Sequence, residues 1–118
     1  MSKILIVDDS RTSRKILREI FTDAGHEIAG EAENGQEGVD KYAELKPDIV
    51  TLDITMPVLD GLAALQEIKK IDPDAKVVMV TAVGKQAKVV EAIKSGASEF
   101  VTKPFDKDNI LKIISKLS

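Results

Sequence analysis

The chain has 118 residues, 43% of them hydrophobic, which suits a single domain with its own apolar core. It has no cysteine, and its formal net charge of −3 comes from interspersed acids and bases, so the composition excludes a disulfide scaffold and argues against nucleic-acid binding. The chain shows neither an apolar run of membrane-span length nor a secretory leader, so we expect a cytoplasmic protein without membrane insertion.

The chain begins with an apolar strand run, Ile4–Val7, followed by a helical pattern that Gly25 ends. One face of this helix, which we expect to be core, carries Ile16, Leu17, Ile20, Phe21 and Ala24. The second run, Ile28–Ala32, alternates apolar with polar or small residues, as an edge strand does.

A second helical pattern ends before Lys46-Pro47 and leads into the third run, Ile49–Leu52. A third helix between Asp60-Gly61 and Asp72-Pro73 precedes the fourth run, Val77–Val80. The first, third and fourth runs are almost continuously apolar, so we expect them to be central strands covered on both faces.

A fourth helical pattern ends at Ser95-Gly96, and the more polar run Phe100–Thr102 fits the other edge of the sheet. The last helix follows a predicted N-cap at Asp106. Its apolar stripe, also expected to be core, consists of Ile110, Leu111, Ile113, Ile114 and Leu117. Five strand–helix repeats of this kind predict a doubly wound α/β fold around a five-stranded parallel sheet.

Residues able to do chemistry directly follow four of these strand runs. Asp8 and Asp9 follow the first, Asp53 the third, Thr81 the fourth and Lys103 the fifth. In an open parallel sheet these strand ends lie at one edge, where ligands bind, so the five side chains should converge.

Three clustered carboxylates require a positive partner, because two unit charges ~4 Å apart repel by about 4 kcal/mol at an effective dielectric near 20. Mg²⁺ held by carboxylates, waters and a phosphate is the usual solution. Lys103 adds a second positive charge and Thr81 a hydroxyl donor, which together describe a phosphoryl pocket. The predicted reaction is phosphoryl transfer to Asp53.

The same residues carry a resemblance to a known family. Each piece alone would be interpreted as a cap, a turn or a strand residue, but together and in this order they resemble the signature of response-regulator receiver domains. The pieces are Val7-Asp8-Asp9, Asp53 with Met56-Pro57 and Asp60-Gly61, Thr81-Ala82, and Lys103-Pro104-Phe105. The chain is most similar to free-standing receivers of chemotaxis, which implies one receiver domain over residues 1–118, no output domain, and a flavodoxin-like strand order 2-1-3-4-5.

The resemblance also implies roles for individual residues. Asp53 would accept the phosphoryl group, and Asp8, Asp9, Asp53 and the main-chain carbonyl of Thr55 would hold Mg²⁺. Lys103 and Thr81 would contact the phosphoryl oxygens, and a cis peptide is implied at Lys103-Pro104. Such a protein catalyses only its own phosphorylation and dephosphorylation and is otherwise not an enzyme.

Three positions depart from, or vary within, the family pattern. Phe100 occupies the aromatic switch position with no hydroxyl, where other members have tyrosine. Thr55 and Val83 flank the pocket, and neither carries an acidic or amide group that could orient a water for hydrolysis.

The implied partners follow from the family. A histidine kinase, or a small donor such as acetyl phosphate, would supply the phosphoryl group. The phosphorylated monomer would control a protein target through the fourth helix, fifth strand and fifth helix. In chemotaxis that target would be a flagellar motor switch protein, and a phosphatase could reset the switch.

Alternative functions remain at this point. The chain could be a phosphorelay intermediate of another pathway. A Mg²⁺-dependent aspartyl-phosphate phosphatase is a second alternative, although such enzymes typically have Asp-x-Asp after the first strand and a cap domain. A flavin carrier is a third, although it needs a phosphate-binding loop at the position where Asp8-Asp9 would repel phosphate. His26 has no second ligand residue at metal spacing, so we expect it in a surface loop.

Overall fold

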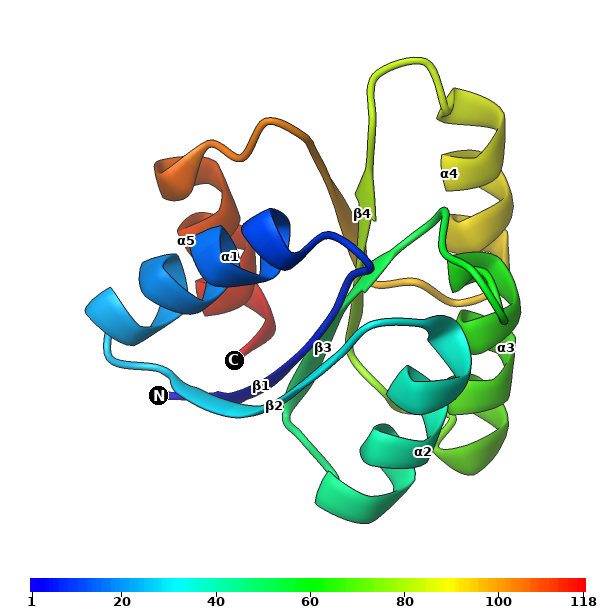
Figure 1. Cartoon of the computed structure of the whole chain (residues 1–118), viewed down its shortest axis with the longest axis horizontal. Coiled ribbons are helices and arrows are strands. Elements are labelled where there is room, and N and C mark those ends of the chain that lie inside the picture. Colours follow the sequence, from blue (N-terminus) through cyan, green and yellow to red (C-terminus); the bar gives the residue numbers. More distant parts are fainter.

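A computed structural model describes residues 1–118 and shows a parallel sheet with helices on both faces (Figure 1). The strands are β1 (Lys3–Val7), β2 (Glu27–Ala32), β3 (Ile49–Asp53), β4 (Val77–Thr81) and β5 (Glu99–Thr102). The helices are α1 (Arg11–Asp23), α2 (Gly35–Leu45), α3 (Gly61–Ile71), α4 (Gln86–Lys94) and α5 (Lys107–Leu117). All pairings are parallel and the strand order is β2-β1-β3-β4-β5, which confirms the predicted fold, central strands and edges.

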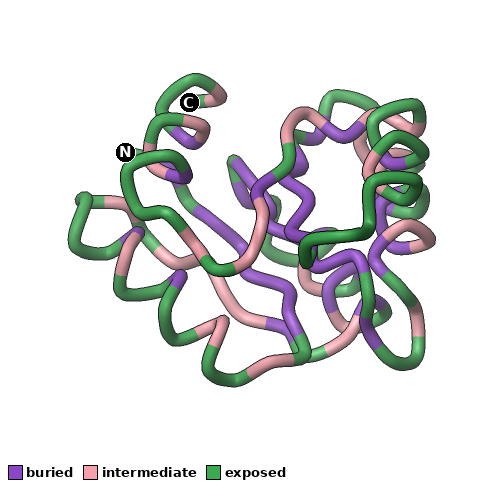
Figure 2. Tube along the Cα trace, turned by 90° about the horizontal axis from the view of Figure 1, so that it is seen from above, coloured by how far each residue is buried: buried purple, intermediate pink, exposed green.

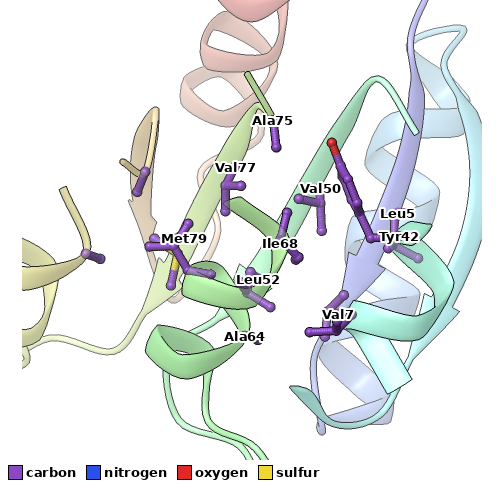
Figure 3. Packing of buried hydrophobic residues seen from close by; sticks show 14 of the residues in the cluster. Leu5, Val7, Tyr42, Val50, Leu52, Ala64, Ile68, Ala75, Val77 and Met79 are labelled. Carbon is purple, nitrogen blue, oxygen red and sulfur yellow. The ribbon is translucent and has the colours of Figure 1, made fainter. Parts of the chain in front are cut away.

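The strands divide their side chains between two cores, since successive residues of a strand point to opposite faces. In β1, Leu5 and Val7 join the core beneath α2, α3 and α4, whereas Ile4 and Ile6 join the core beneath α1 and α5. Figure 3 shows the first of these cores, and Figure 2 shows that buried residues follow the strands while the outer helical faces stay exposed. The central strands β1, β3 and β4 are therefore buried on both faces, whereas the edge strands β2 and β5 are only partly buried.

The predicted helix faces are confirmed with local exceptions. Leu17 and Phe21 are fully buried, but Ile16 is 42% exposed and Ala24 is exposed as well. A helix touches the sheet along a narrow line, so residues at the margins of an apolar face stay in contact with solvent. In α5 the entire predicted stripe packs on the core.

Side-chain caps begin four of the five helices. Ser10, Asn34, Asp60 and Asp106 accept backbone N–H groups from the first turns of α1, α2, α3 and α5. The exception is α4, whose N-cap Lys85 makes no such bond. None of the five helices combines the length and the apolar character that crossing a bilayer requires.

Candidate functional site

The strand ends bring three carboxylates together. Asp8 follows β1 directly and Asp53 is the last residue of β3. One carboxylate oxygen from each of Asp8, Asp9 and Asp53 can be chosen so that all three lie within 4.8 Å of one another. Asp8 and Asp53 are buried and Asp9 is exposed, so the cluster opens to solvent on the side of Asp9.

Lys103, just beyond β5, is the cation that faces this cluster. Its Nζ lies 3.1 Å from Oδ2 of Asp8 and 3.5 Å from Oδ2 of Asp53. Burial alone would lower the pKa of Lys103, but the charges and hydrogen bonds of Asp53 and Asp8 outweigh it and raise that pKa above its usual value. The lysine is therefore charged and shared between two acids. The peptide between Lys103 and Pro104 is cis, as the resemblance implies.

Asp53 has the perturbed titration expected of a crowded carboxylate. Burial raises its pKa most, and the charge of Asp8 raises it further. Lys103 opposes both effects, and the net result is a pKa of about 6. One lysine therefore does not offset the cost of placing this charge beside two other acids.

The donor set suits a hard divalent cation. Apart from the ammonium of Lys103, Oδ2 of Asp8 is buried without a hydrogen-bond partner. Its other oxygen accepts the N–H of Ser10 at 2.8 Å, which fixes the orientation of the carboxylate. Clustered carboxylate oxygens with free lone pairs are the ligands that Mg²⁺ and Ca²⁺ prefer.

Two contacts that the sequence pattern does not predict hold this framework in place. Arg14 of α1 donates to the main-chain carbonyl of Asp8 at 2.7 Å and forms ion pairs with Glu31 and Glu33. Gly61 lies so close to β3 that a Cβ there would meet the carbonyl oxygen of Asp53 at 2.0 Å. The sequence Asp60-Gly61 is a turn signal, but a basic residue in the first turn of a helix carries no distinctive pattern.

Beside Asp53 is a cavity of about 190 Å³. Its walls are formed by Asp53, Ile54, Thr55, Thr81, Ala82, Lys85 and Lys103. The exposed residue Thr55 thus lies at the same cavity as the acid and the lysine. Thr81 is 4% exposed, and its hydroxyl donates to the carbonyl of Ala82 at 3.1 Å. A small anion entering here would meet Asp53, Thr81 and two lysines.

A second hollow of about 650 Å³ lies on the outer side of Thr81, against α4 and β5. Its apolar lining includes Val89, Val90, Ile93 and Phe100, and Phe100 is 44% exposed. Thr81, Ala82 and Lys85 line both hollows. The residue predicted to contact a phosphoryl group therefore lines both the cavity at Asp53 and the hollow that contains the predicted switch residue.

Comparisons with known proteins identify relatives over almost the whole chain. The family description "Response regulator receiver domain" matches residues 4–115. The chain is 53% identical to "Chemotaxis protein CheY" of Thermotoga maritima over 98% of this chain and 97% of that protein. The protein of the same name from Bacillus subtilis is 48% identical, over 97% of this chain and 95% of the relative.

Solved structures show the same similarity. The complex of CheX, CheY, BeF3 and Mg²⁺ from Borrelia burgdorferi contains a chain that superposes with a TM-score of 0.93 at 41% identity. That match covers 98% of this chain and 87% of the other.

Proposed function

Because the chain belongs to the response-regulator receiver domain family, we propose that it is a signalling switch of two-component type whose phospho-acceptor is Asp53. The observation that carries the proposal is the convergence of Asp53 with two further acids and Lys103 at one sheet edge. A buried acid of this kind, placed beside a small cavity, can act as a nucleophile toward phosphorus.

Asp8, Asp9 and Asp53, with the main-chain carbonyl of Thr55, would hold Mg²⁺. When bound, the ion would neutralise carboxylate charge and stabilise the charge that develops on the transferring phosphoryl oxygens. The buried Oδ2 of Asp8, whose one partner is the ammonium of Lys103, and the raised pKa of Asp53 support this assignment, because both mark negative charge that one lysine does not balance.

The chain's own residues would carry out the remaining steps. Oδ of Asp53 attacks phosphorus, the bond from phosphorus to the donor breaks, and the donor leaves with that electron pair. Lys103 would then exchange its contact with the Asp53 carboxylate for phosphoryl oxygens, and the Thr81 hydroxyl would donate to the same group. Water would later hydrolyse the acyl phosphate of Asp53 to the free carboxylate and inorganic phosphate, so the chemistry would act only on the protein's own aspartate.

The output would run through Thr81 and Phe100. Movement of the Thr81 hydroxyl toward a phosphoryl group would enlarge the hollow behind it, and Phe100 would turn inward from its half-exposed position. This movement would remodel the surface of α4, β5 and α5 that a protein target reads. With no hydroxyl on Phe100, apolar burial would hold the inward state.

The pathway we propose is chemotaxis, since the relatives described above carry that name. The phosphodonor would be a histidine kinase of the cytoplasm, and the target of the phosphorylated monomer would be a flagellar motor switch protein. A phosphatase would be a further partner. The Borrelia relative was solved in complex with CheX, which supports a protein partner for this chain as well.

Intact-mass spectrometry after incubation with acetyl phosphate and Mg²⁺ tests the acceptor and the metal together. We expect one hydroxylamine-labile phosphoryl group on the wild type, and none on Asp53→Asn or in excess chelator. Asp23→Asn, which removes an exposed acid at the end of α1, is the matched control and should react like the wild type. A phosphorylated Asp53→Asn protein, or full reaction in chelator, would contradict the proposal.

A further inference from the structure

Lys85 is a second cation at the cavity beside Asp53. The cavity walls contain two basic side chains, Lys85 and Lys103. Lys103 follows β5, whereas Lys85 lies where the loop after β4 enters α4. The acid is therefore approached by a lysine from each of two elements.

The two lysines differ in how far their charge is already neutralised. Lys103 lies within 3.5 Å of both Asp8 and Asp53. Lys85 is exposed and forms no ion pair. Its ammonium is consequently available to an anion arriving from solvent.

Lys85 occupies an uncrowded stretch of the backbone at the start of α4. It occupies the N-cap position of α4 without making a capping bond. The preceding Gly84 has a φ of +96°, and no atom lies within 4 Å of where its Cβ would stand. The loop is therefore uncrowded, and the long side chain can turn toward the cavity or toward the hollow against β5, both of which it lines.

The charge balance of the site indicates what Lys85 would contribute to it. Asp8, Asp9, Asp53 and Lys103 sum to two negative charges, which a divalent cation would only cancel. A doubly negative acyl phosphate entering from solvent would then find a neutral site. The electrostatic field of the unpaired Lys85 ammonium beside the cavity would raise the local concentration of such a donor.

We propose that Lys85 is a specificity-determining residue that recruits small dianionic acyl phosphates to Asp53. The inference rests on the acceptor role proposed for Asp53. In the step concerned, a carboxylate oxygen of Asp53 bonds to phosphorus, and the bond from phosphorus to the acyl oxygen breaks. The carboxylate of the donor departs with the electron pair, and Lys85 acts on the approach and orientation of the phosphoryl oxygens.

The experiment measures second-order rate constants of phosphorylation by intact mass, with Mg²⁺ saturating and donor limiting. The variants are Lys85→Gln and Lys85→Arg, and the control is Lys88→Gln. Lys88 is exposed on the same helix and lines neither hollow, so its removal changes the net charge equally. The two donors are acetyl phosphate, a dianion near neutral pH, and phosphoramidate, which carries less net charge.

We expect Lys85→Gln to lower the rate constant for acetyl phosphate about three- to tenfold, with a smaller loss for phosphoramidate. Lys85→Arg should keep most of the wild-type rate, and raising the salt concentration should shrink the difference. Lys88→Gln should stay within about twofold of the wild type. Equal rates for the two glutamine variants, or equal losses with both donors, would overturn the inference.

Failure of the inference and failure of the proposed function are distinguishable. A wild type that acetyl phosphate and Mg²⁺ do not phosphorylate at Asp53 would overturn both. A wild type that reacts normally, alongside a Lys85→Gln variant as fast as Lys88→Gln, would remove Lys85 alone. Thermal melts of each variant verify that a lower rate constant does not result from unfolding. We expect no loss of stability, because Lys85 is exposed and forms no ion pair.

Discussion

Asp53 pairs its proposed chemical role with a cost to folding. Burial and the neighbouring charge of Asp8 raise its pKa from 3.8 to about 6. An acid whose pKa is higher in the folded state binds more protons there than in the unfolded state. The contribution of Asp53 to the free energy of unfolding is then fully present below about pH 4, and it is lost as the pH rises through about 6.

The direction of this pH dependence can be tested in metal-free protein. Asp53→Asn removes the charge but keeps the shape, so we expect its free energy of unfolding above about pH 7 to exceed that of the wild type by about 1–2 kcal/mol. The gain should vanish below about pH 4, where the native acid is protonated. Urea denaturation with chelator across this range measures it, with Asp23→Asn as the control. A variant less stable than the wild type at neutral pH would contradict the argument.

The convergence of the three acids and Lys103 could be anticipated, because a parallel sheet places the carboxyl ends of all its strands at one edge. Their proximity needed no knowledge of side-chain conformation. Arg14 and Lys85 could not be anticipated in this way. Their long side chains reach the site from helix starts, and nothing in the local sequence says which way such a side chain turns.

Among the structural elements, the loop between β3 and α3 carries the clearest backbone strain. Val58 has a φ of +68°, and the N–H of Leu59 donates to the carbonyl of Pro57 at 2.8 Å, so the three residues form a γ-turn. A β-branched residue is disfavoured at positive φ. Val58 is 81% exposed, so burial of its side chain does not compensate for this strain.

Relief of this strain should stabilise the protein. Asparagine tolerates positive φ, so we expect Val58→Asn to raise the free energy of unfolding by about 1 kcal/mol. Val83→Asn is the matched control, since Val83 is 78% exposed in another loop and is not at positive φ. It should change stability little. Denaturant midpoints compare the two, and equal effects would show that loss of an exposed valine, and not φ, is responsible.

The order of strands and the faces of helices were open to sequence reasoning to different degrees. Apolar continuity separated central strands from edges, but the order 2-1-3-4-5 came from family resemblance. Periodicity located the apolar face of each helix without giving the width of its contact with the sheet. Ile16 of α1 is therefore exposed although it shares the face of Leu17. In α4, only Ala92 is buried, while Val90 and Ile93 remain exposed.

At the scale of the whole molecule, the position of Thr81 links the acidic edge to the outer face. It lies at the end of β4 and lines both the small cavity at Asp53 and the larger hollow at Phe100 (Figure 1 shows the loop that connects β4 to α4). Phe100 lies on the neighbouring strand, paired with Met79. In the proposed switch, the close-packed sheet behind both residues would transmit a displacement instead of absorbing it.

The energy needed for such a switch is within reach of the site. Moving a two-state equilibrium from about 1:99 to about 99:1 takes roughly 5.5 kcal/mol. Hydrogen bonds to charged groups contribute about 1.5–3 kcal/mol each. A phosphoryl group that draws both Lys103 and Thr81 would therefore supply much of this bias.

The coupling can be followed with a single fluorophore, because the chain contains no tryptophan. In Phe100→Trp we expect acetyl phosphate and Mg²⁺ to shift the emission to the blue as the ring leaves solvent. Adding Thr81→Ala should leave phosphorylation intact but remove most of the shift, and adding Asp53→Asn should abolish both.

Amide hydrogen exchange of Glu99–Thr102 in the protein with native Phe100 shows whether the larger indole alters the movement. A full shift without the Thr81 hydroxyl would mean that the signal reaches the outer face by another route, and Lys85, which lines both hollows, would be the first residue to substitute.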